Sequence, residues 1–464
     1  MAESSEPRRW EITWGGFVVE LKKAVALTVP IVASRIFNYL MQVASVVIVG
    51  HLGQLPLSSA AIATSLTNVT GFSLVSGMSG ALDTLCGQAQ GARQYQKLGV
   101  YTYSGIISLT LVCPPICLLW IFFDKLLPLV GQDPTISRYA RNFSLCLIPS
   151  LFGSAILKAI IKYLQTQSLT RPMLLSSFFV LCLHVLVCWL LVFKSELGYL
   201  GAAVASSLST WLNVAIIGFY IKFSPACRRT RVPLSKEAFQ NIGKFFRLGI
   251  PSAIMICLKW WSVELLILLS GLLPNPKLET SVLSICLTIS TLHFTIAYGV
   301  GAAASVRVSN ELGARNPQSA RSAVWAAMFL AIIEAAIFVT VLLSCRSFIG
   351  YAYSNDKQVV KYIAAMDPLV CASIIMDSLQ AVLSGVARGG GWQLWGAYIN
   401  FGAYYLVGLP VAAILAFIAH LRGKGLWIGF VVGSIIQTAL LLLITAFTNW
   451  KKQATKAETR VTGN

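Results

Sequence analysis

The chain of 464 residues is 56% hydrophobic and only 11% charged, whereas soluble globular proteins carry about 25% charged residues. This composition excludes an ordinary soluble domain and predicts a polytopic membrane protein. The formal net charge is +19, but the basic residues lie in short segments between apolar runs, where they set topology, so nucleic-acid binding is not indicated. The eleven cysteines lie mostly inside apolar runs and form no paired C-x-x-C sets, which argues against a disulfide framework or a zinc site.

The polar N-terminal stretch is followed by an apolar run that is too long for a signal peptide and lacks its cleavage pattern, so we expect the N-terminus to be retained. A helix needs about 20 apolar residues to cross a bilayer. Such runs recur twelve times, at roughly 24–50, 57–86, 100–123, 139–165, 173–193, 199–222, 244–272, 280–308, 321–345, 359–387, 394–419 and 425–449. An even number of crossings places both termini on one side, and the two-to-one excess of Lys and Arg on that side predicts that both are cytoplasmic.

The two halves of the chain resemble one another. The stretch Gly91-Ala92-Arg93 recurs as Gly313-Ala314-Arg315 at an offset of 222, and Pro30 recurs as Pro251 at an offset of 221. This repeat predicts an all-α fold of two six-helix lobes. Because six is even, the lobes share one orientation and are related by a pseudo-two-fold axis along the membrane normal, with a binding site between them near the midplane.

The repeat and the charge pattern together divide the chain into five segments. We expect a cytoplasmic N-terminal segment at 1–21, an N-lobe of helices one to six at 22–223, an inter-lobe linker at 224–243, a C-lobe of helices seven to twelve at 244–450, and a C-terminal tail at 451–464. The basic linker reads as a solvated cytoplasmic loop, with a contact to lipid headgroups as the alternative.

The seventh apolar run carries the sequence Lys259-Trp260-Trp261-Ser262-Val263-Glu264. A carboxylate and an ammonium are costly at membrane depth, so the default is that they face a protein-lined, wet interior. Lys259 and Glu264 could instead neutralise each other. Their spacing argues against a pair, because five residues separate side chains by about 140° around a helix, unlike spacings of three or four.

Six stretches resemble the multidrug and toxic compound extrusion (MATE) transporters, and the plant members in particular. They lie at 49–53 (VGHLG), 83–89 (DTLCGQA), 269–276 (LSGLLPNP), 306–314 (VRVSNELGA), 385–389 (GVARG), and 396–400 (GAYIN) with 404–408 (YYLVG). The resemblance spans nearly the whole chain. It implies a V-shaped two-lobe fold and efflux of organic solutes against a cation, usually protons in eukaryotic members.

Carried over residue by residue, the family's seventh-helix glutamate falls on Glu264 and its tenth-helix acid resembles Asp377. We therefore predict that Glu264 and Asp377 form the proton-coupling site, since a carboxylate that is costly to ionise can exchange protons. The chain departs from the pattern at Lys259, where relatives often carry a second glutamate, and its first helix has no acid between Val25 and Val49. Of the other intramembrane acids, we expect Asp83 to have a structural role and Glu334 to be a partnered structural acid.

Other polar and aromatic residues in the apolar runs are predicted to line a substrate cavity. The cationic residue expected there is Arg35, while Lys158 and Lys162 can snorkel to the cytoplasmic interface. Asn38 and Gln42 share one face of the first helix. Flat aromatic faces suit aromatic or cationic solutes, and one of Trp260 and Trp261 is expected to face the cavity. The predicted cavity residues are Arg35, Asn38, Gln42, Lys259, Trp260, Trp261, Tyr298, Tyr398, Asn400 and Tyr404.

The residues favour secondary transport over other functions. No nucleophile, acid/base or metal set indicates an enzyme, the histidines show no ligand spacing, and no Walker A pattern or channel filter motif is present. We expect a monomeric, proton-coupled antiporter without cofactor or metal that exports organic solutes such as xenobiotics or secondary metabolites. Transport of organic anions or flavonoid conjugates is the alternative. The vacuolar and the plasma membrane both fit.

Overall fold

The computed structural model describes residues 14–129 and 131–463, and this part of the chain is nearly all helical and contains no strand. The first half forms α1 (Trp14–Gly50), α2 (Gln54–Thr67), η1 (Asn68–Phe72), α3 (Ser73–Met78), α4 (Gly80–Gly91), α5 (Tyr95–Ile121), α6 (Phe123–Leu129), α7 (Pro134–Thr166), α8 (Arg171–Phe193) and α9 (Leu200–Phe223). The linker contains η2 (Pro225–Cys227) and α10 (Lys236–Gln240). The second half forms α11 (Ile242–Ser270), α12 (Pro276–Gly313), α13 (Pro317–Tyr353), α14 (Lys357–Gly390), α15 (Gln393–Asn400), η3 (Phe401–Gly408), α16 (Leu409–Ala413), η4 (Ile414–Ile418), α17 (Arg422–Phe447) and α18 (Trp450–Thr462).

Eleven helical segments of the described chain are long and apolar enough to cross a membrane, and they match eleven of the twelve predicted spans. The remaining predicted span is not one continuous α-helix. It is divided into α2, η1, α3 and α4, with a turn at Ser79. The stretch is rich in Ser, Thr and Gly, which compete with or weaken regular helical hydrogen bonding.

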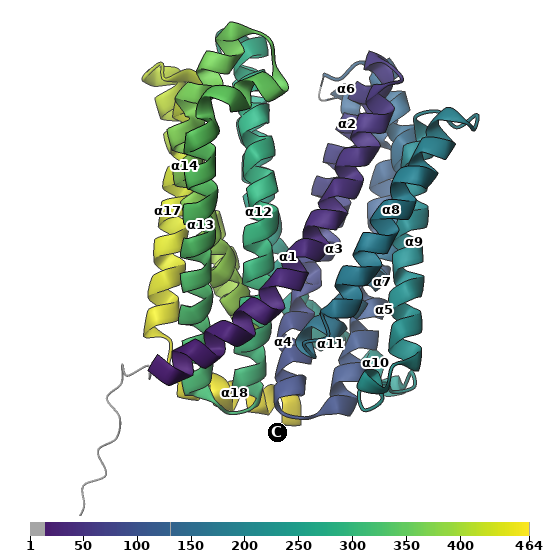
Figure 1. Ribbon diagram of the computed structural model, residues 1–464, viewed down its shortest axis with the longest axis vertical. Coiled ribbons are helices and arrows are strands. Elements are labelled where there is room, and N and C mark those ends of the chain that lie inside the picture. The colour runs from purple at the N-terminus through teal and green to yellow at the C-terminus, as the bar shows by residue number, and fades with distance from the viewer. Residues whose placement is uncertain (1–13, 130, 464) are drawn as a thin grey trace, which may run out of the picture.

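The helices form the predicted V of two lobes (Figure 1). One arm contains α12, α13, α14 and α17, and the other contains α5, α7, α8 and α9. The arms diverge at one end and converge at the end where the described chain begins and stops. Each arm has its own apolar core, one built around Leu109, Trp120 and Leu151, the other around Met366, Ile374 and Trp427.

The first helix of each lobe crosses to the other lobe at the converging end. The early turns of α1 pack on α12, and the early turns of α11 pack on α3 and α4. Two glycines allow these crossings: a Cβ on Gly299 would lie 2.6 Å from Val32, and one on Gly77 would lie 2.6 Å from Ala253. The two contacts correspond to each other in the sequence repeat, because Gly77 and Gly299 are 222 residues apart and Val32 and Ala253 are 221 residues apart. The structure therefore confirms the pseudo-two-fold relation predicted from the sequence.

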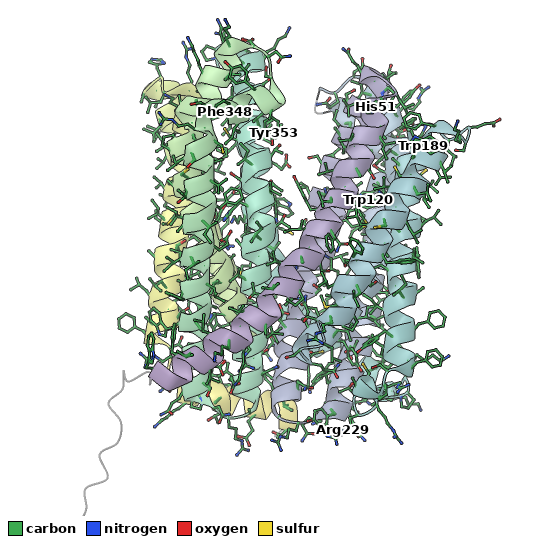
Figure 2. All side chains as sticks on the ribbon, viewed as in Figure 1. His51, Trp120, Trp189, Arg229, Phe348 and Tyr353 are labelled. Atoms are coloured by element: carbon green, nitrogen blue, oxygen red, sulfur yellow. The ribbon has the colours of Figure 1, made fainter. Side chains whose placement is uncertain are left out.

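The segment predicted as a C-terminal tail forms α18, which lies across the converging end (Figure 1). Its apolar face buries Trp450, Ala454, Ala457 and Val461 at spacings of three and four residues. The helix contacts α12 and α13 of one lobe and α4 of the other. Arg229 of the linker lies at this same end, whereas His51 and Tyr353 lie at the diverging end (Figure 2).

Candidate substrate cavity and ionisable network

A cavity of about 360 Å³ lies mainly within the N-lobe. It is lined by α1, α2, η1, α3, α7, α8 and α9, and α12 contributes Thr295 and Tyr298. It extends from Arg35 and Lys162 to Val49 and Ala60, toward the end where the arms diverge. Cavities of this size bind drug-sized molecules in other proteins.

A cluster of charged residues forms the inner end of this cavity. Arg35 lies over the ring of Tyr298, with 4.1 Å from Cζ to the ring centroid, and Arg388 lies 5.2 Å from the same centroid. The carboxylate of Asp83 is completely buried and pairs with Lys162 Nζ at 2.6 Å and with Arg388 Nε at 3.2 Å. A single buried acid is thus shared by two cations, which offsets the cost of burying all three.

The local sequence explains why these side chains converge. Lys158 and Lys162 are four residues apart on α7, so they share the face of the helix that lines the cavity. Arg35, Asn38 and Gln42 follow the same rule on α1. Asn38 Nδ2 is held by donating to the Ser34 carbonyl at 2.7 Å and to a serine hydroxyl of α8 at 3.3 Å. The structure thus places Arg35, Asn38, Gln42 and Tyr298 on the wall of one cavity.

Lys259 belongs to a separate buried site in the C-lobe. Its ammonium donates to Asp377 Oδ1 at 2.6 Å and to Gln380 Oε1 at 2.8 Å, and it lies 4.1 Å from the ring centroid of Phe294. Trp260 packs edge-to-face on the same phenylalanine. Two pockets of only about 20 and 30 Å³ adjoin these residues. Such pockets hold no more than water, so in this conformation Lys259 and Trp260 border a packed region.

Glu264 faces the opposite lobe. It is half-buried on α11 and accepts a hydrogen bond of 3.3 Å from Ser65 Oγ of α2. Among the residues that the structure describes, no salt bridge includes Glu264 and no hydrogen bond joins it to Asp377. The angle of about 140° between positions 259 and 264 turns one side chain toward α14 and the other toward α2. The two acids predicted to form one proton-coupling site therefore have different partners.

Four other predicted cavity residues lie away from all three cavities described above. Trp261 is 43% exposed and donates from Nε1 to the Val69 carbonyl at 3.4 Å, and Tyr398 is 63% exposed beside Trp395. Asn400 and Tyr404 are buried and bond to Gln437 at 2.6 and 2.7 Å. Because buried polar groups must be satisfied, this internal network accounts for Asn400 and Tyr404 without a ligand.

Three cationic residues in or near the cavity were not predicted from the sequence to be functional. Lys158 and Lys162 do not reach the interface as expected: Lys158 lines the cavity and Lys162 is bonded to Asp83. Arg388 lies in the family motif at 385–389, and the sequence predicted no cavity role for it. The one sequence signal available was the spacing of four between Lys158 and Lys162.

Glu334, expected to be partnered, lies 3.0 Å from His293 Nε2 and accepts from Ser378 at 2.7 Å.

The lobes touch closely at the converging end, beyond the charged cluster. A Cβ on Gly91 would lie 1.9 Å from the Asn310 carbonyl oxygen, and one on Gly313 would lie 2.1 Å from the Gln88 carbonyl oxygen. Thr84 Oγ1 donates to the Arg388 carbonyl, and Gln88 Nε2 donates to the Gly389 carbonyl at 3.1 Å. The two copies of the repeated Gly-Ala-Arg motif therefore pack on each other and close this end of the cavity.

The MatE family model matches residues 30–190 and 251–414, which is more than half of the chain. The chain belongs to the MatE family of transporters. Two curated relatives from Arabidopsis thaliana, Protein DETOXIFICATION 13 and Protein DETOXIFICATION 14, are each 52% identical to this MatE transporter. Each alignment covers 97% of this chain, and it covers 94% of the first relative and 93% of the second.

Solved structures agree with this assignment. The crystal structure of the eukaryotic MATE transporter AtDTX14 matches with a TM-score of 0.93 at 52% identity, covering 96% of this chain and all of that one. A MOP superfamily transporter from Pyrococcus furiosus matches with a TM-score of 0.83 at 18% identity, covering 97% and 99%, and shares the fold. The predicted family and fold class are confirmed, and the chain is a membrane-embedded transporter of small molecules. No group of His, Cys, Asp or Glu in the described residues has the arrangement of a metal site.

Proposed function

We propose that this transporter is a proton-coupled antiporter that exports organic solutes from the cytoplasm by alternating access. The observation that carries the proposal is the environment of Glu264. Its carboxylate is half-buried between the arms, and its hydrogen-bond partner is a neutral hydroxyl of the other lobe. A carboxylate without a cationic partner at membrane depth is costly to ionise, so it binds protons readily.

This location also gives a physical route from proton binding to conformation. The ionised carboxylate of Glu264 accepts a charge-assisted hydrogen bond from Ser65, which links α11 to α2 across the gap between the lobes. Protonation weakens that acceptor. The balance between open and closed arrangements of the lobes then depends on the proton, as antiport requires.

We propose a second, linked role for Asp377. Its pairing with Lys259 neutralises both charges, so a proton reaching Asp377 would leave the ammonium held only by Gln380 and Phe294. Glu264 and Asp377 thereby act together although they do not touch. Proton binding at either residue changes how α11 packs on its neighbours.

In the proposed cycle the cavity loads solute while it is open to the cytoplasm and while Glu264 and Asp377 are ionised. The lobes, residues 22–223 and 244–450, then rock about the linker at 224–243, and solute leaves as protons bind. Proton and solute exclude each other when the protonated state binds solute less well. A coupling of about 1–3 kcal/mol changes affinity roughly 5- to 150-fold.

The test measures solute affinity against pH on the purified chain in detergent. Affinity should weaken as pH falls, and Glu264→Gln should abolish that weakening. Glu196→Gln, which removes an exposed loop carboxylate, is the matched control and should behave like the parent. If parent affinity is independent of pH, direct competition is wrong and coupling lies in the rates of conformational change. Substrate-driven proton flux in proteoliposomes provides the second readout.

Orientation, membrane and assembly belong to the same proposal. We infer cytoplasmic termini from the basic residues of the linker and of α18, which lie at the converging end (Figure 2). With that orientation, the arrangement described here opens away from the cytoplasm. We further propose that the chain works as a monomer in the vacuolar or the plasma membrane, because each six-helix lobe already buries an apolar core of its own.

A further inference from the structure

We propose that the N-lobe cavity takes organic anions, with a carboxylate or sulfate group bound between Arg35 and Lys158. This inference rests on the proposed function, because it assumes that the transported solute occupies this cavity. It concerns the chemical class of that solute and not the source of energy for transport.

The lining of the cavity has one sign of charge. Arg35, Lys158 and Lys162 belong to it, and none of its residues is an aspartate or a glutamate. Arg388 is a further cation close to this lining, with its Cζ 5.2 Å from the centroid of the Tyr298 ring. Organic cations therefore meet no counter-charge at the inner end of the cavity, whereas an anion meets several cations in a region with little water. A field of one sign between low-dielectric walls concentrates ions of the opposite sign.

The one nearby acid does not neutralise this cluster. Both oxygens of Asp83 are engaged, one by Lys162 and the other by Arg388. In the described part of the chain, no salt bridge includes Arg35 or Lys158. A charge in such a place is normally paired, so two cations here without a carboxylate partner favour an anionic group on the solute.

Arg35 is held in a position to receive this anion. Its guanidinium is stacked on the ring of Tyr298, a contact that orients the side chain but does not cancel its charge. Its Nε is buried and has no hydrogen-bond partner. A planar guanidinium whose Nε–H has no partner matches the geometry of a carboxylate or sulfate, while the ammonium of Lys158 acts as a second point charge.

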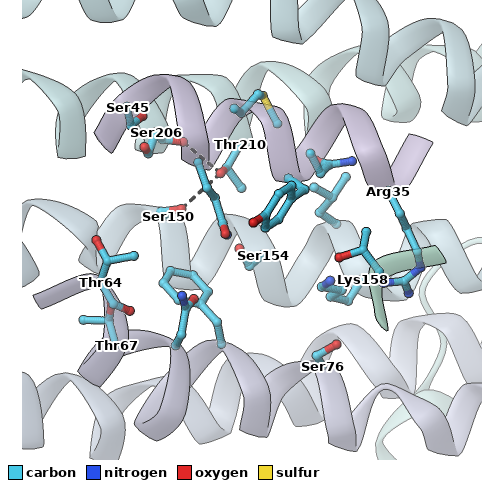
Figure 3. Close-up of a pocket in the computed structure, with 18 of the residues that line it drawn as sticks. Arg35, Ser45, Thr64, Thr67, Ser76, Ser150, Ser154, Lys158, Ser206 and Thr210 are labelled. Atoms are coloured by element: carbon cyan, nitrogen blue, oxygen red, sulfur yellow. Dashed lines mark hydrogen bonds between the residues drawn. The ribbon is translucent and has the colours of Figure 1, made fainter. Parts of the chain in front are cut away.

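The rest of the cavity fits the body of such a molecule. Figure 3 shows Arg35 and Lys158 close together at one end, while Thr64, Thr67, Ser150, Ser206 and Thr210 gather at the other. Hydroxyl groups both donate and accept, so they suit the hydroxyl and ether oxygens of a solute. The cavity therefore fits an elongated organic anion whose charged group lies innermost and whose polar body points toward the diverging arms.

The test compares two dyes that share a xanthene ring system but differ in charge. Binding of fluorescein, an anion, and of tetramethylrhodamine methyl ester, a cation, is measured by fluorescence anisotropy on the purified full-length chain. We expect fluorescein to bind more tightly. In Arg35→Gln and Lys158→Gln, loss of a charged partner should weaken fluorescein binding about tenfold or more, while binding of the cation should be unchanged or tighter.

Two variants separate this effect from loss of folding. Arg35→Lys keeps the charge and should retain most of the fluorescein affinity. Lys452→Gln removes an exposed charge from α18 and should leave it unchanged. A melting temperature measured for each variant shows whether the fold is intact. Equal affinity of the parent for both dyes, or equal loss of both in Arg35→Gln with an unchanged melting temperature, would overturn the inference.

The outcomes also separate this inference from the proposed proton coupling. Tight fluorescein binding that needs Arg35, without transport driven by a pH gradient, would support the anion site and contradict antiport. Transport of the cationic dye driven by a pH gradient, with no fluorescein binding, would support antiport and contradict the anion site. Chloride or phosphate that occupies the cluster without any binding of fluorescein would show a site for inorganic ions only, and would also overturn the inference.

Discussion

Removing one charge of the Lys259–Asp377 pair should destabilise the C-lobe far more than removing both. The perturbation is a set of three variants: Lys259→Met, Asp377→Leu and the double variant. Each single change leaves a buried charge without its partner, because both side chains are at least nine-tenths buried. The double change replaces the pair by apolar side chains of similar size.

The magnitude follows from the geometry of the pair. At a separation of 2.6 Å and an effective dielectric constant of about 20, the two charges attract by about 6 kcal/mol. Much of this attraction offsets the cost of taking both ions out of water. Loss of one partner of a buried pair typically costs about 3–5 kcal/mol, whereas apolar replacement of both is often neutral. The Gln380 carbonyl loses its donor in the double variant, which costs about 1 kcal/mol.

The assay is thermal unfolding of each purified variant in the same detergent, combined as a double-mutant cycle. The melting temperature should fall clearly for both single variants and recover most of the way in the double variant. Ser344→Ala, an exposed position on α13, is a control for mutation and purification. Equal melting temperatures of the single and double variants would contradict the prediction, and so would effects of the two single changes that simply add in the double variant. Either result would mean that the two charges do not depend on each other.

Three further predictions concern transport. Glu264→Gln should abolish pH-driven solute uptake into proteoliposomes while the melting temperature stays unchanged; uptake with the parent's pH dependence would contradict its assignment. Lys259→Glu places a second carboxylate beside Asp377, so one of the two must bind a proton. The selectivity of transport should then move toward organic cations, as measured by competition between charged solutes. An unchanged solute profile would mean that Lys259 has only a structural role. Gly91→Val places a side chain against the Asn310 carbonyl, so the converging end should open; thiol labelling of Thr84→Cys should rise, and unchanged labelling would contradict the closing contact.

Much of the fold could be predicted because membrane insertion leaves a direct signal in the sequence. A spanning helix must satisfy its backbone internally and present about 20 apolar residues, so the spans could be counted. The second span was predicted as one run at 57–86, but its helix is interrupted at η1 and at Ser79, where the stretch is rich in Ser, Thr and Gly. The repeat of Gly91 at Gly313 predicted the pseudo-two-fold axis, and the structure shows these glycines packed against the opposite copy.

The site was less predictable, because the sequence gives spacing along a helix but not the partner across a gap. The five-residue spacing of Lys259 and Glu264 correctly separated them, yet the partner of Lys259 could have been any acid of the C-lobe. Only the tertiary structure, which brings the Asp377 carboxylate of α14 within 2.6 Å of the Lys259 ammonium, assigned it to Asp377. Asn400 and Tyr404 show the converse, since they look like cavity residues until Gln437 is found to satisfy them.

The sequence by itself determined the class of molecule: apolar length, charge asymmetry and internal repeat require a two-lobe helical transporter, because these properties are read locally, one helix at a time. The tertiary structure decided which charges are compensated. Asp83 forms ion pairs with Lys162 and Arg388, so Arg35 and Lys158 face the cavity without a carboxylate partner. Compensation depends on distances of about 3–4 Å between helices far apart in the chain, and no local pattern encodes such distances.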